Sequence, residues 1–177
     1  QGYRVDGQKT FVLEGMAATH FIVAARTAGA PQDPEGITLL LVAADAPGVT
    51  RTQLQTSDSR GYANVSFAGV TVGEDAVLGS AGAGRDLLTQ ILDCARAGIA
   101  AEMLGTAAQA FDMTLSYLKT RVQFGQVIGS FQALGHRAAE LFTEMELTRS
   151  CVEAALQAID AGAADVAQLA SLAKCRA

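Results

Sequence analysis

The segment RVQFGQVIGSFQ, residues 121–132, decides how the second half of this chain is organised, because it separates two long segments with helical periodicity. Its twelve residues include one permanent positive charge, three glutamines, two phenylalanines and two glycines. Arg121 carries a planar guanidinium whose paired N–H donors suit a diphosphate. The segment therefore has the composition of a nucleotide-binding turn as well as that of a simple connector.

Two glutamines and two phenylalanines extend this chemistry. Gln123 and Gln132 can hydrogen-bond to the edges of a ribose or an adenine. Phe124 and Phe131 can flank a flat ring. The alternative is a helix–helix turn in which the aromatic residues form a hydrophobic plug and Arg121 neutralises the C-terminal end of a helix. Composition alone leaves both interpretations open.

Apolar residues recur about every 3.6 residues on both sides of this segment, which predicts two long helices. The first spans Arg85 to about Lys119, and the second spans Ser130 to about Asp160. The dipeptide Ala161-Gly162 is typical of a helix end, and Asp165 can begin a third helix that continues to the end of the chain. The second half is therefore expected to contain antiparallel helices.

Residues 3–78 instead have the pattern of short strands separated by turns. We expect strands at residues 5–13, 21–25, 37–42, 50–55, 63–67 and 70–72, with a turn at Asp6-Gly7 inside the first. Such spacing favours an antiparallel sheet or barrel. The Gly-rich residues 79–84 lack the spacing of a phosphate-binding loop, so we expect a flexible joint there. Strands followed by helices predict an α+β fold with two segregated parts.

The composition excludes several classes of function. The net charge of −5 argues against non-specific binding of nucleic acid. No apolar run approaches the length of a membrane span. Cys94, Cys151 and Cys175 lie in helical segments without close pairing or clustered histidines. We therefore expect neither a disulfide framework nor a metal site.

The pattern R-x-Q-F-G-x-x-I-G-x-F-Q closely resembles a signature of the acyl-CoA dehydrogenase family of flavoproteins, with eight specified positions at the right spacing. The resemblance implies that Arg121 pairs with the diphosphate of FAD. It also implies that the adenosine side is lined by Gln123, Phe124, Ile128, Phe131, Gln132 and Leu134. In the family this segment reaches FAD held mainly by a neighbouring subunit. A homodimer or homotetramer, or a hetero-oligomer, is therefore expected.

The first half is similar to the later part of the family's middle β domain. Residues 7–12 match a G-x-K-x-aromatic-aliphatic strand that passes the flavin ring, so the resemblance makes Phe11 a flavin-facing aromatic. An ordinary core strand residue is the alternative for Phe11. Leu13 replaces a threonine that hydrogen-bonds the flavin in many members. The resemblance thus divides the chain into a partial antiparallel β domain, residues 1–80, and the start of an up-and-down helical bundle, residues 81–177.

Substrate contacts are implied on the first long helix. By resemblance, Asp93 and Arg96 help to hold the pantetheine and nucleotide portion of acyl-CoA, and the alternative is a surface ion pair with i,i+3 spacing. One branch of the family carries its catalytic glutamate where this chain has Ala95, and most members supply it from a later segment. We therefore assign no catalytic residue here. We interpret the chain as an internal fragment that does not turn over acyl-CoA alone.

The resemblance implies FAD-dependent α,β-dehydrogenation of acyl-CoA in fatty acid metabolism, with an electron-transferring flavoprotein as acceptor. It places the protein in the bacterial cytoplasm or the mitochondrial matrix. Three alternatives remain open. One is a flavin oxidase or monooxygenase on the same fold. Another is a non-catalytic subunit that completes a partner's FAD site. The last is a helical interaction module without a cofactor.

Overall fold

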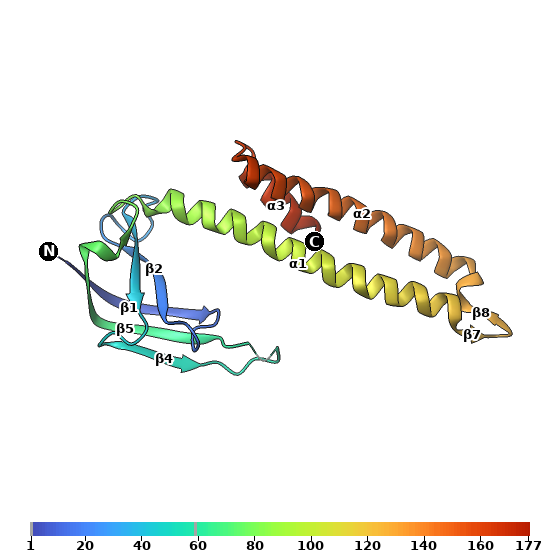
Figure 1. Ribbon diagram of the computed structural model, residues 1–177, viewed down its shortest axis with the longest axis horizontal. Helices are drawn as coiled ribbons and strands as arrows, with labels where there is room; N and C mark the ends of the chain where they lie inside the picture. The colour runs from blue at the N-terminus through green and yellow to red at the C-terminus, as the bar shows by residue number, and fades with distance from the viewer. Residues whose placement is uncertain (1, 59) are drawn as a thin grey trace. The chain divides into compact units, whose positions relative to one another are not determined.

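The computed structural model describes residues 2–58 and 60–177, which form two units, Gln1–Thr89 and Gln90–Ala177 (Figure 1). The first unit consists of antiparallel strands, and the second is dominated by antiparallel helices. The predicted α+β fold class, with strands before helices, is confirmed.

The first unit contains two three-stranded antiparallel sheets, ordered β1-β5-β4 and β2-β3-β6. A short 3-10 helix, Glu74–Ala76, precedes the last strand. The strands are β1 Gly2–Val12, β2 His20–Arg26, β3 Ile37–Ala43, β4 Val49–Gln53, β5 Ala63–Gly73 and β6 Val77–Leu78. The predicted antiparallel arrangement is therefore realised as two sheets that share one core.

Side chains along each strand point alternately inward and outward, and the inward-pointing ones build this core. In β5, Val65 and Phe67 point inward and are almost completely buried, and Phe21 and Val23 do the same from β2. The rings of Phe21 and Phe67 meet edge to face, with centroids 6.3 Å apart. One residue from each sheet contributes to this pair, so the two sheets pack through a common hydrophobic layer.

The predicted turn at Asp6-Gly7 is wrong, because β1 continues through it. The register of β1 against β5 shifts between Val5 and Gly7, which marks a β-bulge. The carboxylate of Asp6 accepts a hydrogen bond from the Gly69 amide at 2.7 Å. The sequence predicts separate strands at residues 63–67 and 70–72, but the structure joins them in one strand, β5. Gly69, with a φ of 64°, lies between the two predicted strands. Residues typical of turns here accommodate an irregular strand pair.

The sequence predicts a flexible joint at the Gly-rich residues 79–84, and within this segment Gly82 is hydrogen-bonded to β3 and to Gly36, the residue before β3. The Gly82 amide donates to the hydroxyl of Thr38 at 2.8 Å, and the Gly82 carbonyl accepts from the Gly36 amide at 3.2 Å. A Cβ added at Gly84 would lie 2.9 Å from the carbonyl oxygen of Ile37. Glycine is thus required for close approach of two backbones.

Replacing Thr38 with valine is expected to destabilise the strand unit by about 1–3 kcal/mol, because the part-buried Gly82 amide loses its acceptor. Thr38 is fully buried and also hydrogen-bonds to the Thr27 hydroxyl at 2.7 Å. Urea unfolding followed by circular dichroism measures the change. Thr52→Val, at an exposed position on β4, is the matched control. Equal stabilities of the two variants would contradict the anchoring role.

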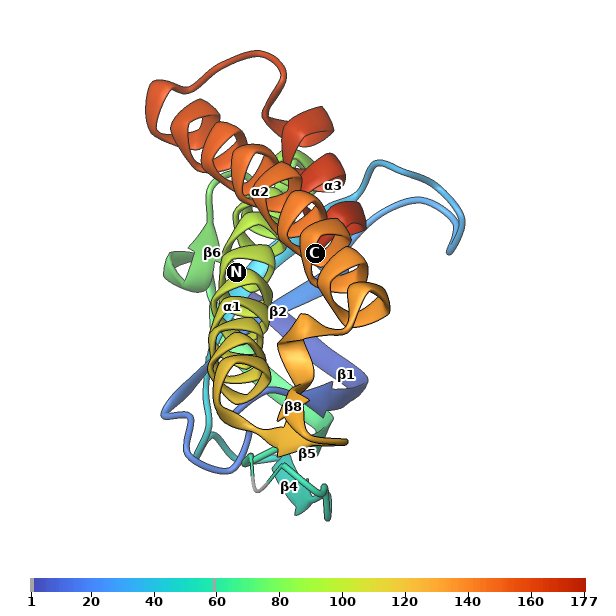
Figure 2. The ribbon, with the colours of Figure 1, turned by 90° about the vertical axis from the view of Figure 1, so that its right-hand side faces the viewer.

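The second unit is built on three helices. They are α1 Gly84–Thr120, whose first residues belong to the strand unit, α2 Gln132–Ala161 and α3 Val166–Arg176. Figures 1 and 2 show α1 and α2 running antiparallel, with α3 alongside α2. Small residues fill the seam where the three helices meet, namely Ala97, Ala100, Val152, Ala155, Ala170 and Ala173. The Ala-rich sequence therefore gives close helix packing.

Residues 2–58 and 60–177 contain neither a membrane-spanning helix nor a cluster of metal-binding side chains. None of the helices there combines the length and the apolarity that crossing a membrane requires. Within the same residues, no group of three or more His, Cys, Asp or Glu side chains is arranged to hold a metal ion.

Candidate functional site

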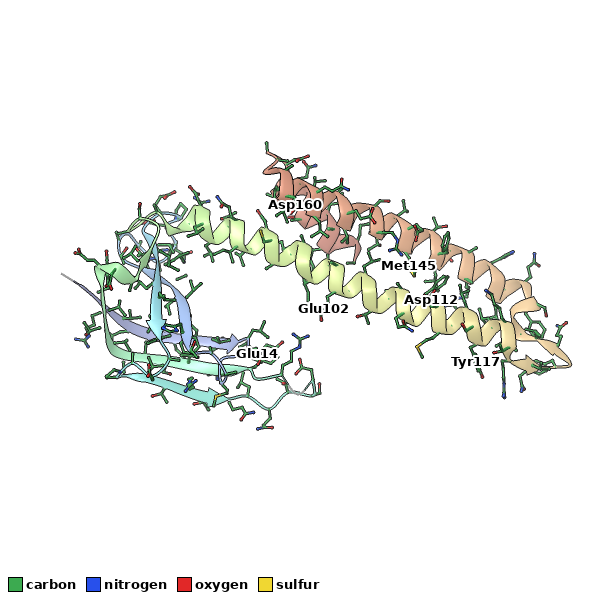
Figure 3. The ribbon with its side chains drawn as sticks, viewed as in Figure 1. Glu14, Glu102, Asp112, Tyr117, Met145 and Asp160 are labelled. Atoms are coloured by element: carbon green, nitrogen blue, oxygen red, sulfur yellow. The ribbon has the colours of Figure 1, made fainter. Side chains whose placement is uncertain are left out.

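The segment between α1 and α2 is a two-stranded hairpin, which the sequence did not reveal. Val122–Gln123 (β7) pairs with Gln126–Val127 (β8). The Arg121 amide donates to Tyr117 at 2.9 Å, and the Arg121 carbonyl accepts from Ile128 at 2.8 Å. Figure 3 labels Tyr117 near this end of α1. These bonds fix the backbone of Arg121 at the base of the hairpin, residues 121–127, hereafter the 121–127 hairpin.

The tip of the hairpin presents an aromatic ring to solvent. Phe124 and Gly125 have φ values of 55° and 78°, as in a turn that needs positive φ at both central positions. The Phe124 side chain is 90% exposed and meets Phe131 edge to face, with centroids 6.1 Å apart. Ring contact therefore orients Phe124 without burying it.

The predicted nucleotide-binding residues lie on the hairpin, in the short segment that leads into α2, and in the first turn of α2. Arg121, Gln123 and Gln132 are exposed. Ile128, which begins the 3-10 helix Ile128–Ser130, is half-buried, as are Phe131 and Leu134. Among the described residues, no carboxylate forms an ion pair with the Arg121 guanidinium. The segment thus combines free polar donors with a half-buried apolar base.

Backbone strain coincides with two of the predicted cofactor contacts. Among the described residues, the non-glycine positions with positive φ are Phe11 at 52°, Glu14 at 51° and Phe124 at 55°. Such conformations cost about 1–3 kcal/mol each and tend to occur at binding sites. Phe11 and Phe124 are also strongly exposed aromatic residues. Neither burial nor easy backbone geometry explains a phenylalanine at these two positions.

Phe11 is not the core strand residue that the sequence left as an alternative, because its side chain is 67% exposed. It lies near the end of β1, and its ring centroid is 6.0 Å from that of Tyr62. Leu13 is 55% exposed in the turn that follows, next to Glu14, which Figure 3 labels. Tyr62 was not singled out from the sequence, and it lies just before the predicted strand at residues 63–67, which the structure pairs with β1.

Asp93 and Arg96 form an i,i+3 ion pair on α1, with an N–O distance of 2.5 Å, which was the alternative to their predicted contact with substrate. The pair is asymmetric: the Asp93 side chain is 7% exposed and that of Arg96 is 43% exposed. Asp93 and Cys94 line a cleft of about 480 Å³, whose other wall is the turn between α2 and α3 near Gly162. A buried carboxylate therefore holds a guanidinium whose remaining N–H groups reach solvent.

Sequence profiles of two protein domains match most of this chain. The profile described as "Acyl-CoA dehydrogenase, middle domain" matches residues 1–74. The profile described as "Acyl-CoA dehydrogenase, C-terminal domain" matches residues 82–177. The first match ends before the Gly-rich residues 79–84, and the second begins within them.

A curated relative, the rat short/branched chain specific acyl-CoA dehydrogenase, mitochondrial, is 34% identical over 163 residues, which are 90% of this chain and 38% of the relative. The chain spans about two fifths of the length of the curated relatives that it matches. Butyryl-CoA dehydrogenase from Megasphaera elsdenii has a similar structure, with a TM-score of 0.92 and 29% identity over 99% of this chain and 46% of that one.

A third similarity involves a chain in the structure described as "Electron transferring flavoprotein of Acidaminococcus fermentans: Towards a mechanism of flavin-based electron bifurcation". Its TM-score is 0.92, with 30% identity, and the match covers 99% of this chain and 46% of that one. Both units and the hairpin between α1 and α2 fall within this match.

Proposed function

This chain belongs to the acyl-CoA dehydrogenase family, and on that premise we propose that the complete protein uses FAD to dehydrogenate an acyl-CoA thioester between its α and β carbons. The observation that carries the proposal is the 121–127 hairpin. Among residues 2–58 and 60–177, no carboxylate pairs with its guanidinium, and it presents a strained, exposed phenylalanine within the family's motif. The similarity to named acyl-CoA dehydrogenases supports the reaction class.

The residues of the hairpin fit the nucleotide end of FAD. Arg121 holds the diphosphate, since its planar fork can donate two parallel hydrogen bonds to phosphate oxygens. Gln123 and Gln132 hydrogen-bond the adenosine, and Phe124 covers a face of it. The half-buried apolar side chains on the adenosine side are those of Ile128, Phe131 and Leu134. An exposed arginine without an ion-pair partner is consistent with an anionic ligand.

Phe11 fits the flavin end of the cofactor, because it offers an exposed ring on a strained backbone. FAD, when bound, supplies the redox chemistry, and the chain supplies position and electrostatics. Leu13 presents a hydrocarbon where a hydroxyl would donate a hydrogen bond.

Asp93 and Arg96 fit the CoA portion of the substrate. Asp93 is buried and orients Arg96, and the exposed N–H groups of Arg96 bind phosphate or amide oxygens of CoA. Removing the α proton requires a carboxylate whose pKa is raised by an apolar pocket. Ala95 has no ionisable group, so another part of the complete protein provides this base. No residue of this chain is assigned a catalytic role.

The proposal extends to the partners of the protein. The hairpin completes an FAD site with a neighbouring subunit, so a homodimer or homotetramer is part of the cofactor site. An electron-transferring flavoprotein accepts the electrons, which the similarity to a chain in a structure of that description supports. Such a protein acts in fatty acid metabolism, in the bacterial cytoplasm or in the mitochondrial matrix.

A second candidate is a non-catalytic subunit that completes a partner's FAD site in a hetero-oligomer. Two residues favour it: Leu13 replaces the hydroxyl that tunes the flavin in many members, and Ala95 replaces the glutamate of one branch. Neither residue interferes with the hairpin. The two candidates differ in whether the complete protein binds FAD and turns over substrate without a second kind of subunit.

The purified complete protein is expected to be yellow, with a flavin absorption spectrum that acyl-CoA bleaches under anaerobic conditions. Residues 1–177 alone are expected to show no turnover with acyl-CoA and an artificial electron acceptor. Turnover by this chain would show that it contains the base. A colourless complete protein that gains flavin with a second subunit would favour the non-catalytic role. A complete protein that never binds flavin would favour a cofactor-free interaction module. Rapid oxygen consumption by the flavin-bound protein would favour an oxidase.

A further inference from the structure

We propose that Gly129 and Phe131 are positioning residues for the cofactor: they hold the 121–127 hairpin against the end of α1, so that Arg121 and Phe124 meet the nucleotide together. The inference rests on the proposed FAD site. It adds a role for Gly129, and it adds support of Phe124 to the proposed contact of Phe131 with the adenosine.

Gly129 has no room for a side chain. A Cβ added there would lie 2.7 Å from the carbonyl oxygen of Leu118 and 3.2 Å from its carbonyl carbon, and real Cβ atoms essentially never come closer than 3.0 Å. The neighbour is the backbone of the last turns of α1, which cannot rotate away as a side chain can. Gly129 is not among the glycines with positive φ, so close approach is the reason for glycine here.

A displacement at Gly129 would be transmitted directly to both proposed nucleotide contacts. On its N-terminal side, the Ile128 amide donates to the carbonyl of Arg121 at 2.8 Å. On its C-terminal side, Phe131 contacts the ring of Phe124. The Ser130 hydroxyl also donates to the Val127 carbonyl at 2.6 Å, which ties the segment to β8. Residues 128–131 thus connect α1 to both the base and the tip of the hairpin.

The chain provides a matched control six residues away. Gly135 lies in α2, and a Cβ added there would meet no atom within 4 Å. Alanine is a better helix former than glycine, so Gly135→Ala is expected to keep or raise stability. The same substitution at Gly129 and at Gly135 therefore separates displacement of the hairpin from a general effect of an added methyl group.

The test measures the Kd of FAD for the apo form of the complete protein by quenching of flavin fluorescence. Gly129→Ala is expected to raise Kd by about tenfold, as expected when a single well-placed contact is lost, while helicity is retained. Gly135→Ala is expected to leave Kd unchanged. The double variant Gly129→Ala/Arg121→Ala should lose less affinity than the sum of the two single losses, because part of the effect of Gly129 passes through Arg121.

Each outcome supports or overturns the inference. If Arg121→Ala leaves Kd unchanged, the proposed FAD site fails and this inference fails with it. If Arg121→Ala weakens binding but Gly129→Ala does not, or if the double variant shows additive losses, the positioning role alone is wrong. If Gly129→Ala loses helicity, Phe131→Leu decides, because it removes the ring support and keeps the backbone: an unchanged Kd for that variant overturns the inference.

Discussion

Replacing Arg121 with alanine is expected to raise the Kd of FAD for the complete protein by roughly 10- to 150-fold. A hydrogen bond to a charged group contributes about 1.5–3 kcal/mol, and each 1.4 kcal/mol corresponds to about a factor of ten in affinity. Folding should be unaffected, because the hydrogen bonds of Arg121 to Tyr117 and Ile128 involve its backbone alone. Equilibrium dialysis of FAD against apo-protein measures the change.

Two variants make this result specific. Arg121→Lys keeps the positive charge but loses the planar fork, so its affinity should fall between those of the wild type and the alanine variant. Arg137→Ala removes another exposed arginine, on α2, and should leave the affinity unchanged. Equal losses in Arg121→Ala and Arg137→Ala, with wild-type affinity in Arg121→Lys, would indicate a general charge effect. Wild-type affinity in all three would remove the main support for a nucleotide site at the hairpin.

The two long helices could be predicted closely because their hydrophobic period extends over many turns. The sequence predicts the first from Arg85 to about Lys119, and α1 spans Gly84–Thr120. The strands of the first half were harder to predict, because Asp-Gly is favoured both in turns and in β-bulges. The pairing with the neighbouring strand decides which of the two forms. The two-residue strand β6 was missed, since two residues cannot display an alternating pattern.

The residues of the candidate site could be selected from the sequence, but their conformations could not. Each strand of the 121–127 hairpin has only two paired residues, so no periodicity reveals it. Phenylalanine rarely adopts positive φ, so nothing local predicts the backbone of Phe124. Asp93 lines a cleft together with the turn near Gly162, which lies far along the chain. Contacts between residues that are distant in sequence thus determine the backbone conformation and the surroundings of the site residues, which the motif alone does not predict.

Replacing Phe124 with asparagine is expected to change stability and cofactor affinity in opposite directions. Asparagine tolerates positive φ and is favoured before glycine in this kind of turn, so relief of about 1–3 kcal/mol of strain should stabilise the apo-protein. The lost edge contact with Phe131 offsets part of this gain, about 0.5–1.5 kcal/mol. The affinity for FAD should fall by roughly tenfold, because stacking on a nucleobase contributes about 1–3 kcal/mol.

Replacing a second exposed phenylalanine, Phe142, is expected to have the opposite effect on stability and no effect on the affinity for FAD, so this variant is the control. Phe142 is 54% exposed in the middle of α2, and its ring centroid is 6.4 Å from that of Phe111. Phe142→Asn should destabilise the helical unit and leave the affinity for FAD unchanged. If Phe124→Asn instead lowers the urea midpoint and leaves the affinity intact, the ring at the hairpin tip serves packing on Phe131. Its positive φ then carries no functional meaning.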